Sequence, residues 1–284
     1  MLYSRNDITK TYEQVHDLLL TRYIIKTYSK NKSDIRDVAL KDLDCKNIKK
    51  VLELGCGYGF FIEKLKNRLH NGAVIIGIDM VENNREPFLH SVSSIQYKGE
   101  FIGGNADIIT QMANESFDMI ITSYSLYFFP HLIPEISRIL VPDGVFFAIT
   151  HSKNTLREAM KFIHSCMNAV GFNTKNETIL NKLFSAFSME DGHYLLEQYF
   201  RSIERLDYPN AMVFPAEHVD DFIFYIRKKQ NLIYKEVMEL MPDRLDDVLA
   251  CVDMKISDYV KMNGHVILNK DDAVFRCHKP ISRQ

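Results

Sequence analysis

Short apolar runs alternate with polar or amphipathic segments along the first half of the chain. The strongest runs occupy residues 50–54, 74–78, 119–122 and 145–150, and a weaker one lies within residues 95–102. Each is too short for a helix, and most are rich in β-branched residues, which is typical of strands buried on both faces of a parallel sheet. Helices are predicted between them. The pattern therefore predicts an α/β fold with a doubly wound, mostly parallel sheet and helices on both faces.

Helical periodicity replaces this alternation at both ends of the chain. In the N-terminal region, apolar residues recur near helical spacing at Ile8, Tyr12, Val15, Leu18, Leu19 and Tyr23. After residue 151 the succession of strand, glycine and helix stops, and residues 155–170 and most of 171–262 are predicted to be helical. Near the end, two apolar stretches flank the polar residues 269–272, which predicts an antiparallel hairpin at a sheet edge.

These patterns divide the chain of 284 residues into four segments. They are a helical N-terminal segment (1–48), an α/β core (49–152), a helical insert rich in Phe, Tyr and Met (153–262), and a C-terminal hairpin that completes the sheet (263–284). The length suffices for one large domain with such additions.

Charge and cysteine content argue against several classes of protein. The formal net charge is -2 and the basic residues are scattered, so we expect no nucleic-acid partner. The five cysteines form no CxxC pair, so we expect reduced thiols and no metal. A polar N-terminus and the lack of a membrane-spanning apolar run predict a cytoplasmic protein without a membrane partner. The oligomeric state is left open.

A glycine-rich turn follows the first predicted strand. Gly55, Gly57 and Gly59 come directly after that strand, and Asp79 ends the next strand, 20 residues beyond Gly59. Glycines let the backbone turn tightly beside a ligand, and an acid at the end of the second strand can accept hydrogen bonds from ribose hydroxyls. A helix is predicted to run from this turn to about residue 70.

Glu53, two residues before the turn, discriminates between two kinds of nucleotide ligand. Dinucleotide enzymes have G-x-G-x-x-G and bind a pyrophosphate at the turn, whereas this chain has G-x-G-x-G. The carboxylate of Glu53 would repel a pyrophosphate and attract a cationic amino group. Spacing and charge therefore favour adenosylmethionine over NAD, and argue against a dehydrogenase.

Five linked motifs resemble those of class I S-adenosylmethionine-dependent methyltransferases, in particular small-molecule enzymes of the ubiquinone-biosynthesis type (type 11). They occupy residues 53–59, 77–80, 104–107, 117–126 and 140–145, within the span 48–152. The last motif includes a turn at residues 142–144. The resemblance implies a Rossmann-like fold, with S-adenosylmethionine as methyl donor and S-adenosylhomocysteine as product.

The resemblance also implies which residues contact the cofactor. At the glycine turn and the strand ends these are Glu53, Gly55, Cys56, Gly57, Gly59, Asp79, Met80 and Ser123. For the adenine it implies a backbone N–H near Ala106 and an acceptor, which is Asn105 or, in a shifted register, Asp107. The N-terminal segment would cover the cofactor as a lid and contribute Tyr12.

Candidate catalytic and substrate residues follow the fourth and fifth strands. Methyl transfer is an in-line displacement, so positioning and exclusion of water supply much of the catalysis. A base is needed only where the acceptor loses a proton. His151, directly after the fifth strand, is the candidate base, and a purely structural histidine is the alternative. Tyr124, Tyr127 and His131 are candidate substrate contacts.

The predicted function is methyl transfer to O, N or C of a small molecule. The aromatic insert suits an apolar acceptor, and the lack of a basic groove argues against nucleic acid. Methylation of RNA or protein is one alternative. A non-catalytic, adenosylmethionine-binding regulatory subunit is another, because a fold alone does not fix catalytic competence.

Overall fold

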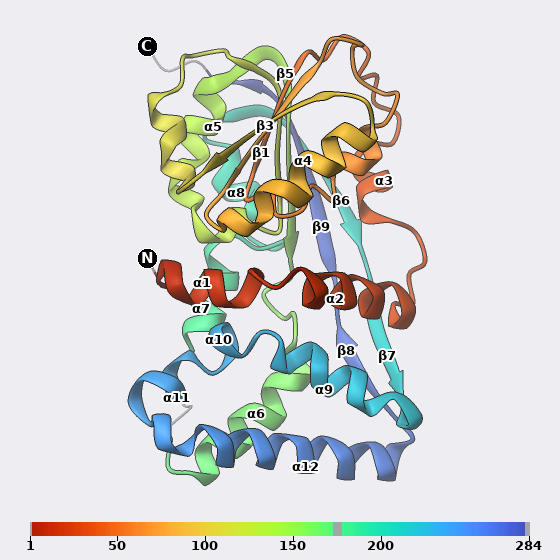
Figure 1. Ribbon diagram of the computed structural model, residues 1–284, viewed down its shortest axis with the longest axis vertical. Helices are drawn as coiled ribbons and strands as arrows, with labels where there is room; N and C mark the ends of the chain where they lie inside the picture. The colour runs from red at the N-terminus through yellow and green to blue at the C-terminus, as the bar shows by residue number, and fades with distance from the viewer. Residues whose placement is uncertain (1, 173–177, 282–284) are drawn as a thin grey trace. The chain divides into compact units, whose positions relative to one another are not determined.

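The computed structural model describes residues 2–172 and 178–281. Parts of the predicted N-terminal segment, insert and C-terminal hairpin (residues 1, 173–177 and 282–284) lie outside the described residues. The strands are β1 Lys50–Leu54, β2 Val74–Asp79, β3 Lys98–Gly103, β4 Phe117–Ser123, β5 Leu140–His151, β6 Phe200–Tyr208, β7 Ala211–Pro215, β8 His265–Asn269 and β9 Asp272–Pro280 (Figure 1).

Helices fill most of the remaining described chain. They are α1 Arg5–Tyr12, α2 Val15–Tyr28, α3 Ile35–Ala39, α4 Arg85–Ser94, α5 Ile133–Ile139, α6 Arg157–Ala169, α7 Ile179–Ala186, α8 Gly192–Leu196, α9 Val219–Arg227, α10 Gln230–Ile233, α11 Lys235–Leu240 and α12 Leu245–Asn263.

The described strands form a seven-stranded sheet in the order β3-β2-β1-β4-β5-β9-β6. Its first five strands in chain order, β1 to β5, pair in parallel. β9 pairs antiparallel with both β5 and β6. The predicted Rossmann-like α/β class with a mostly parallel sheet is confirmed. The strand order reverses between β1 and β4, and sheets of this kind bind ligands beyond the carboxyl ends of the strands at such a point.

Burial on both faces explains why the parallel strands are apolar throughout. In β1, Val51 and Leu52 point to opposite faces, and both are fully buried. Val51 belongs to a core cluster that also contains Phe88 of α4 and Phe147 of β5. A strand with water on one face would instead alternate apolar and polar residues.

The chain divides into two compact units, each built from separate stretches. The helical unit comprises Met1–Lys32, Lys153–Phe184 and Pro209–Asp271, and the sheet unit comprises Ser33–Ser152, Ser185–Tyr208 and Asp272–Gln284, as far as these residues are described. The helical unit also contains the small β7-β8 sheet. These boundaries cut across the four predicted segments, and the roles predicted for a lid and a substrate-covering insert stay predictions.

Two strands lie where the insert was predicted to be helical. β6 forms one edge of the large sheet, and β7 pairs with β8. β6 carries the exposed charged residues Arg201, Glu204 and Arg205. Because an edge strand tolerates charge on its open side, β6 lacks the apolar run on which strand prediction relies.

The C-terminal residues add antiparallel pairing to the sheet, but the predicted hairpin between them is wrong. β8 pairs with β7, whereas β9 pairs with β5 and β6. The polar residues between β8 and β9 form a link rather than a reversal. Asn210 supports this link, because its N–H donates to Asp271 Oδ1 and its carbonyl accepts from Lys270 N, at 2.8 and 3.1 Å.

Two local predictions in the sheet unit are also wrong. In place of the helix predicted to follow the glycine turn, the structure has a short 3₁₀ helix, η1 (Ile62–Leu65). Lys64 N donates a hydrogen bond to Phe61 O there, at 3.0 Å. Asn67 then adopts a left-handed φ of 59°, which ends the helical winding. Residues 142–144 form no turn but lie within β5, where the β4–β5 register shifts.

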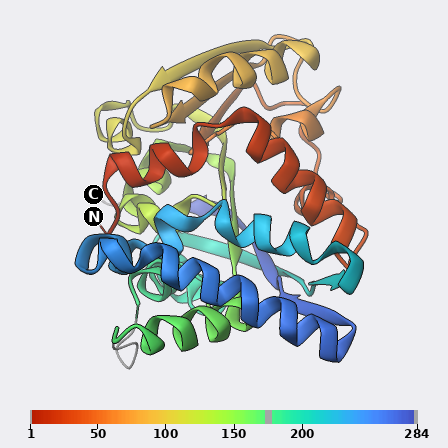
Figure 2. The ribbon, with the colours of Figure 1, turned by 60° about the horizontal axis from the view of Figure 1, so that its bottom comes forward.

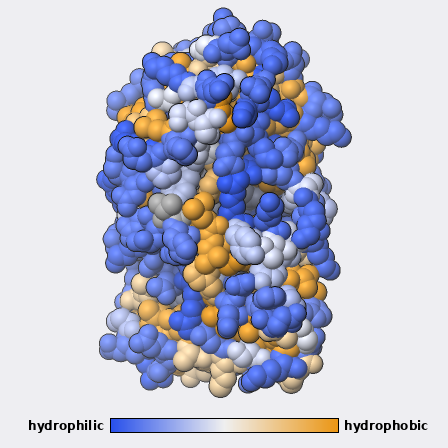
Figure 3. Space-filling model, turned by 45° about the vertical axis from the view of Figure 1, so that its right-hand side comes forward, coloured by the Kyte–Doolittle hydropathy of each residue, from blue (hydrophilic) through white to orange (hydrophobic). Residues whose placement is uncertain are grey.

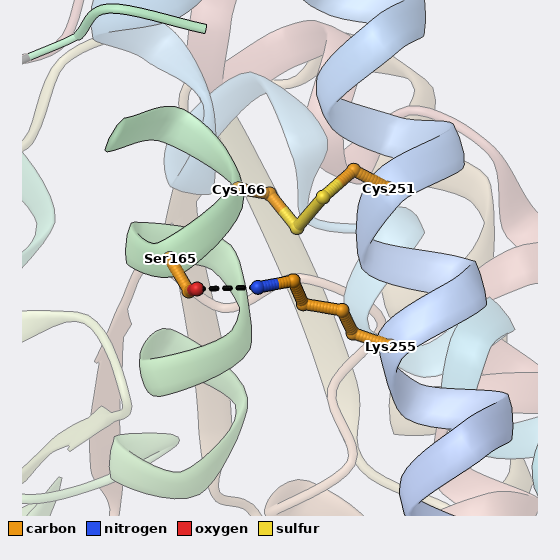
Figure 4. Close-up of a disulfide and its surroundings, with 4 residues drawn as sticks. All are labelled: Ser165, Cys166, Cys251 and Lys255. Carbon is orange, nitrogen blue, oxygen red and sulfur yellow. Dashed lines mark hydrogen bonds between the residues drawn. A yellow bond between two sulfur atoms is a disulfide. The ribbon is translucent and has the colours of Figure 1, made fainter. Parts of the chain in front are cut away.

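Two cysteines are joined in a disulfide, contrary to the expectation of reduced thiols. Cys166 of α6 bonds to Cys251 of α12, and nearby Lys255 Nζ donates to Ser165 Oγ at 2.6 Å (Figure 4). Figure 2 shows these two helices side by side. The partners are 85 residues apart in sequence, so only the packing of α6 on α12 reveals the pair.

On the face of the molecule that Figure 3 shows, most of the surface is polar, with apolar side chains among the polar ones. Large apolar side chains that stay exposed include Tyr194 and Met262, which is ordinary for folded proteins. None of the described helices combines the length and the apolar character needed to cross a bilayer.

We predict that the disulfide stabilises the fold. Because it restricts the unfolded chain, the double replacement Cys166→Ala and Cys251→Ala should lower the free energy of unfolding by about 2–4 kcal/mol. Denaturant unfolding without reductant measures the difference. Dithiothreitol provides the control, since it should destabilise the wild type and leave the variant unchanged. Wild-type stability that does not respond to reductant would contradict the prediction.

Candidate functional site

The glycine turn lies at the carboxyl end of β1, where the strand order reverses. Gly55 and Gly57 have positive φ angles of 67° and 49°, a conformation that glycine adopts without strain. A side chain at Gly55 would also collide with Ser125, whose Cβ is 2.5 Å from the position of an added Cβ. At Gly57 nothing lies within 4 Å of that position. The turn is therefore closed on the Gly55 side and open at Gly57.

Backbone hydrogen bonds attach this turn to the neighbouring strands. Gly55 N and Cys56 N donate to Ile78 O of β2, at 2.8 and 3.2 Å. From the segment after β4, Ser125 Oγ donates to Leu54 O at 2.6 Å. Sequence analysis missed this role of Ser125, although the residue lies in the fourth motif.

The side chain of Cys56 points into the core rather than to the open side of the turn. Its Sγ packs closely against Gly77 of β2. Burial, followed by the charges of Asp79 and Glu53, raises the pKa of the thiol well above its ordinary value. The thiol therefore stays neutral, and Cys56 shapes the turn through its backbone.

Glu53 is a buried carboxyl group next to the turn. The residue is 2% exposed, and its Oε2 has no hydrogen-bond partner among the described residues. Burial, and then the charge of Asp79, raises its pKa well above the ordinary value, with a smaller opposing effect from Arg36. An unsatisfied buried acceptor is costly, and a ligand that donates to it removes the cost. A cationic amino group has the charge and the donors that this position lacks.

Asp79 ends β2 and organises the neighbouring corner of the site. Its Oδ2 accepts from Gly57 N at 2.7 Å, and its Oδ1 accepts from Val81 N at 2.8 Å and Asn84 Nδ2 at 3.0 Å. Burial raises the pKa of Asp79, and these three hydrogen bonds act in the opposite direction. Because a carboxylate has about four lone-pair directions, Oδ2 retains capacity for one ribose hydroxyl.

Asn84 also belongs to this corner, and sequence analysis did not find it. It is 1% exposed, and its Oδ1 has no hydrogen-bond partner among the described residues. The only signal in the sequence was its position five residues after Asp79. Together with Glu53 Oε2, Asn84 Oδ1 gives the corner two unsatisfied acceptors, which suits a ligand rich in N–H and O–H groups.

The segment after β3 brings the predicted adenine contacts to the same edge. Gly104 N donates to Asp79 O at 2.9 Å. Asn105 caps the 3₁₀ helix η3 (Ala106–Gln111) by accepting from Asp107 N. Asp107 Oδ1 in turn lies 2.8 Å from Nε2 of His131, and both side chains are exposed. The structure thus brings His131 to this segment, and the choice between Asn105 and Asp107 stays open.

Four other predicted cofactor residues have simple positions in the fold. Gly59 has a positive φ of 69°, and Met80 follows Asp79 at the end of β2. Ser123 ends β4 opposite Ile149 of β5. Tyr12 ends α1 in the helical unit. Their contacts with a cofactor stay predictions.

A second group of predicted residues meets at the carboxyl end of β5. His151 Nδ1 lies 2.7 Å from Asp272 Oδ1, and Tyr124 donates its hydroxyl to Asp272 Oδ2 at 2.8 Å. The rings of Tyr124 and Tyr127 stack with His151 at centroid distances of 4.5 and 6.0 Å. His151, Tyr124 and Tyr127 are therefore together, as their predicted roles require. Asp272 was missed because it was placed in a hairpin loop.

Comparison with known proteins identifies the core of this unit. Residues 52–148 match the model of a family described as a methyltransferase domain. Residues 52–148 therefore form a methyltransferase domain. For these residues the match confirms the resemblance to a methyltransferase that was drawn from the motifs. No curated protein matches the sequence.

Solved structures with a similar fold have low sequence identity to the chain. The YcgJ protein from Bacillus subtilis is 14% identical with a TM-score of 0.53, covering 88% of this chain and 98% of that one. The [4+2]-cyclase SpnF is 14% identical with a TM-score of 0.52, covering 97% and 96%. The cyclopropane synthase MmaA2 from Mycobacterium tuberculosis is 14% identical with a TM-score of 0.50, covering 96% and 97%. At this identity the likeness shows the fold alone.

We predict that Glu53 makes the protein less stable as pH rises. Its raised pKa means that the folded state holds the proton more tightly than the unfolded chain, so stability falls as pH rises above the ordinary value of 4.5. Glu53→Gln removes this loss. The free energy of unfolding of the variant, relative to wild type, should therefore increase from about pH 4 to pH 8.

Denaturant unfolding across this pH range measures the effect. Glu86→Gln is the matched control, because Glu86 is an exposed glutamate on α4 of the same unit. The free energy of unfolding of Glu86→Gln should differ little from that of wild type at every pH. A difference for Glu53→Gln that does not change with pH would show that the group is not a neutral buried acid.

Proposed function

We propose that this protein transfers a methyl group from S-adenosylmethionine to a small-molecule acceptor. The observation that supports the cofactor most strongly is the buried, unsatisfied carboxyl group of Glu53 beside the open turn at Gly57. A pyrophosphate would place negative charge next to two acids, the buried Glu53 and the partly buried Asp79. An amino group instead donates hydrogen bonds and neutralises charge.

The residues of the sheet edge divide the recognition of this cofactor among them. Glu53 receives the amino group, and the backbone of the glycine turn lies against the amino-acid part. Asp79 and Asn84 accept from the ribose hydroxyls. Ala106 N, with Asn105 or Asp107, contacts the adenine. The cofactor supplies an electrophilic methyl group on a sulfonium, and its product is S-adenosylhomocysteine.

The aromatic cluster after β4 and β5 supports a small acceptor. Tyr124 and Tyr127 stack with His151, so they offer apolar faces beside one imidazole. His151 takes a proton where the acceptor carries one. The net charge of -2 gives no general attraction for RNA. The alternatives to this proposal are an RNA or protein acceptor and a non-catalytic role, and the experiments below distinguish them.

Isothermal titration of the full chain with S-adenosylmethionine, S-adenosylhomocysteine and NAD tests the cofactor. We expect the two sulfur compounds to bind with dissociation constants in the micromolar range, which corresponds to about −8 kcal/mol. NAD should not bind. Binding of NAD without the sulfur compounds would overturn the proposal.

Replacement of Asp79 tests the ribose contact. Asp79→Ala should weaken S-adenosylmethionine binding by about 10- to 100-fold, because charge-assisted hydrogen bonds are lost. Asp143→Ala, at an exposed aspartate of β5, is the matched control and should bind as the wild type does. Unchanged affinity in a folded Asp79→Ala protein would remove Asp79 from the site.

Formation of S-adenosylhomocysteine in the presence of separate acceptor pools tests the acceptor class. Pools of small hydroxy compounds, amines and thiols are compared with total RNA and with a protein extract. The proposal expects turnover with a small-molecule pool. Turnover with RNA or protein alone would replace the proposed acceptor class, and binding of the cofactor without turnover in any pool would favour a non-catalytic subunit.

A further inference from the structure

We propose that Asp272 is a positioning residue that holds His151 in the tautomer with a protonated Nδ1, so that Nε2 takes a proton from the methyl acceptor. This inference rests on the proposed function and adds the chemical class of the acceptor. The acceptor is a hydroxyl, a thiol or an N–H group, whose atom loses a proton when it is methylated.

Strand pairing fixes the distance between the two residues. His151 is the last residue of β5, and Asp272 is the first residue of β9 and its direct partner in the β5–β9 register. On the other side, Asp272 pairs with Tyr208 of β6. Directly opposite residues on neighbouring strands have adjacent side chains. Asp272 therefore approaches His151 from a rigid strand that is paired on both sides.

The hydrogen bonds of Asp272 determine which imidazole nitrogen carries the proton. Asp272 is 2% exposed, and a carboxylate can only accept hydrogen bonds. Oδ2 accepts from Tyr124, and Oδ1 lies 2.7 Å from His151 Nδ1, so this nitrogen must be the donor. A neutral imidazole that donates from Nδ1 carries its lone pair on Nε2.

Tyr124 keeps Asp272 in the accepting role. Burial, and then the charge of Asp272, raises the pKa of the Tyr124 phenol well above its ordinary value. The phenol therefore remains a donor to Asp272 Oδ2 through the physiological pH range. Its ring also covers one face of the His151 imidazole, with an angle of 28° between the two planes.

The backbone around His151 is held as firmly as its side chain. Two hydrogen bonds connect it to the segment that precedes α8. Thr150 Oγ1 donates to Phe187 O at 2.8 Å, and Met189 N donates to His151 O at 2.9 Å. Ser152 Oγ donates to Glu190 Oε1 at 2.6 Å. Residues on both sides of His151 are thus anchored to one segment. A base that is fixed in this way loses little entropy when it meets its substrate.

The short segment after β4 connects this cluster to the glycine turn. Tyr124 has a left-handed φ of 58°, which is costly for a bulky residue and occurs preferentially at functional sites. Its neighbour Ser125 contacts Gly55 and donates to Leu54 O. One segment therefore touches the proposed cofactor site and the His151 cluster.

The proton transfer balances without any further reactant. The bond between the acceptor atom and its hydrogen breaks, and the proton passes to Nε2 of His151. The electron pair of the acceptor atom forms the bond to the methyl carbon, while the electrons of the broken carbon–sulfur bond stay on sulfur. The imidazolium that forms is stabilised by the negative charge of Asp272. The proton then leaves to solvent from His151, whose side chain is 11% exposed.

The tautomer of His151 is measurable without any substrate. Long-range ¹H–¹⁵N correlation spectra of the uniformly ¹⁵N-labelled full chain distinguish the two neutral imidazole forms. The His151 signals are identified among the 10 histidines by their loss in His151→Gln. In wild type above pH 8 we expect the Nδ1-protonated form. An Nε2-protonated form would overturn the proposal.

The variant Asp272→Asn has a side chain of nearly the same shape and can donate as well as accept. It should convert His151 partly or wholly to the Nε2-protonated form. Tyr124→Phe leaves the carboxylate in place and should retain the wild-type tautomer. Asp207→Asn, at an exposed aspartate of β6, is the matched control and should change nothing. A wild-type tautomer in folded Asp272→Asn would contradict the role of Asp272.

S-adenosylmethionine titration of the same samples separates this inference from the proposed function. Asp272→Asn should bind the cofactor as wild type does, within a factor of about two. Once an acceptor is identified, the kcat of Asp272→Asn with it should be about 10²- to 10⁴-fold below that of wild type, with little change in KM. A changed tautomer with unchanged kcat would show that Asp272 orients His151 without a part in methyl transfer. Failure of wild type to bind the cofactor would reject the proposed function instead.

Discussion

The approach of Ser125 to Gly55 is the contact on which the rest of the site depends. It joins β1 to the segment after β4 at the point where the strand order of the sheet reverses. Any larger residue at position 55 would separate the two segments. The turn opens at Gly57 on one side, and Tyr124, the neighbour of Ser125, has a left-handed φ and stacks with His151.

Two acids, the buried Glu53 and the partly buried Asp79, make this arrangement expensive for the folded protein without a ligand. Glu53 and Asp79 both have raised pKa values because burial disfavours their charge, and Asp79 adds to the shift of Glu53. Asp79 offsets its burial with three hydrogen bonds, whereas Glu53 Oε2 has none among the described residues. We propose that a cationic cofactor with several hydrogen-bond donors satisfies both acids. The protein without ligand is then less stable than it would be without these acids, and the acids strengthen cofactor binding.

The sequence predicted features that depend on local pattern and missed those that depend on long-range packing. The parallel strands and the glycine turn were found because two-sided burial and backbone geometry restrict which residues can stand there. The exposed edge strand β6, the pairing of β8 with β7, and the Cys166–Cys251 disulfide leave no such pattern. Asn84 and Asp272 were missed because partners in the folded chain define their roles. The predicted cofactor and substrate contacts remain to be tested on the protein.

Proton release on cofactor binding tests whether the amino group of the cofactor pairs with Glu53. Isothermal titrations with S-adenosylmethionine at about pH 6, in buffers of different ionisation enthalpy, count the protons released, and an ordinary glutamate is already ionised at that pH. If the amino group binds the carboxylate of a previously protonated Glu53, wild type releases up to about one proton more than Glu53→Gln does. Equal release from both proteins, or binding of wild type without release, would contradict the account.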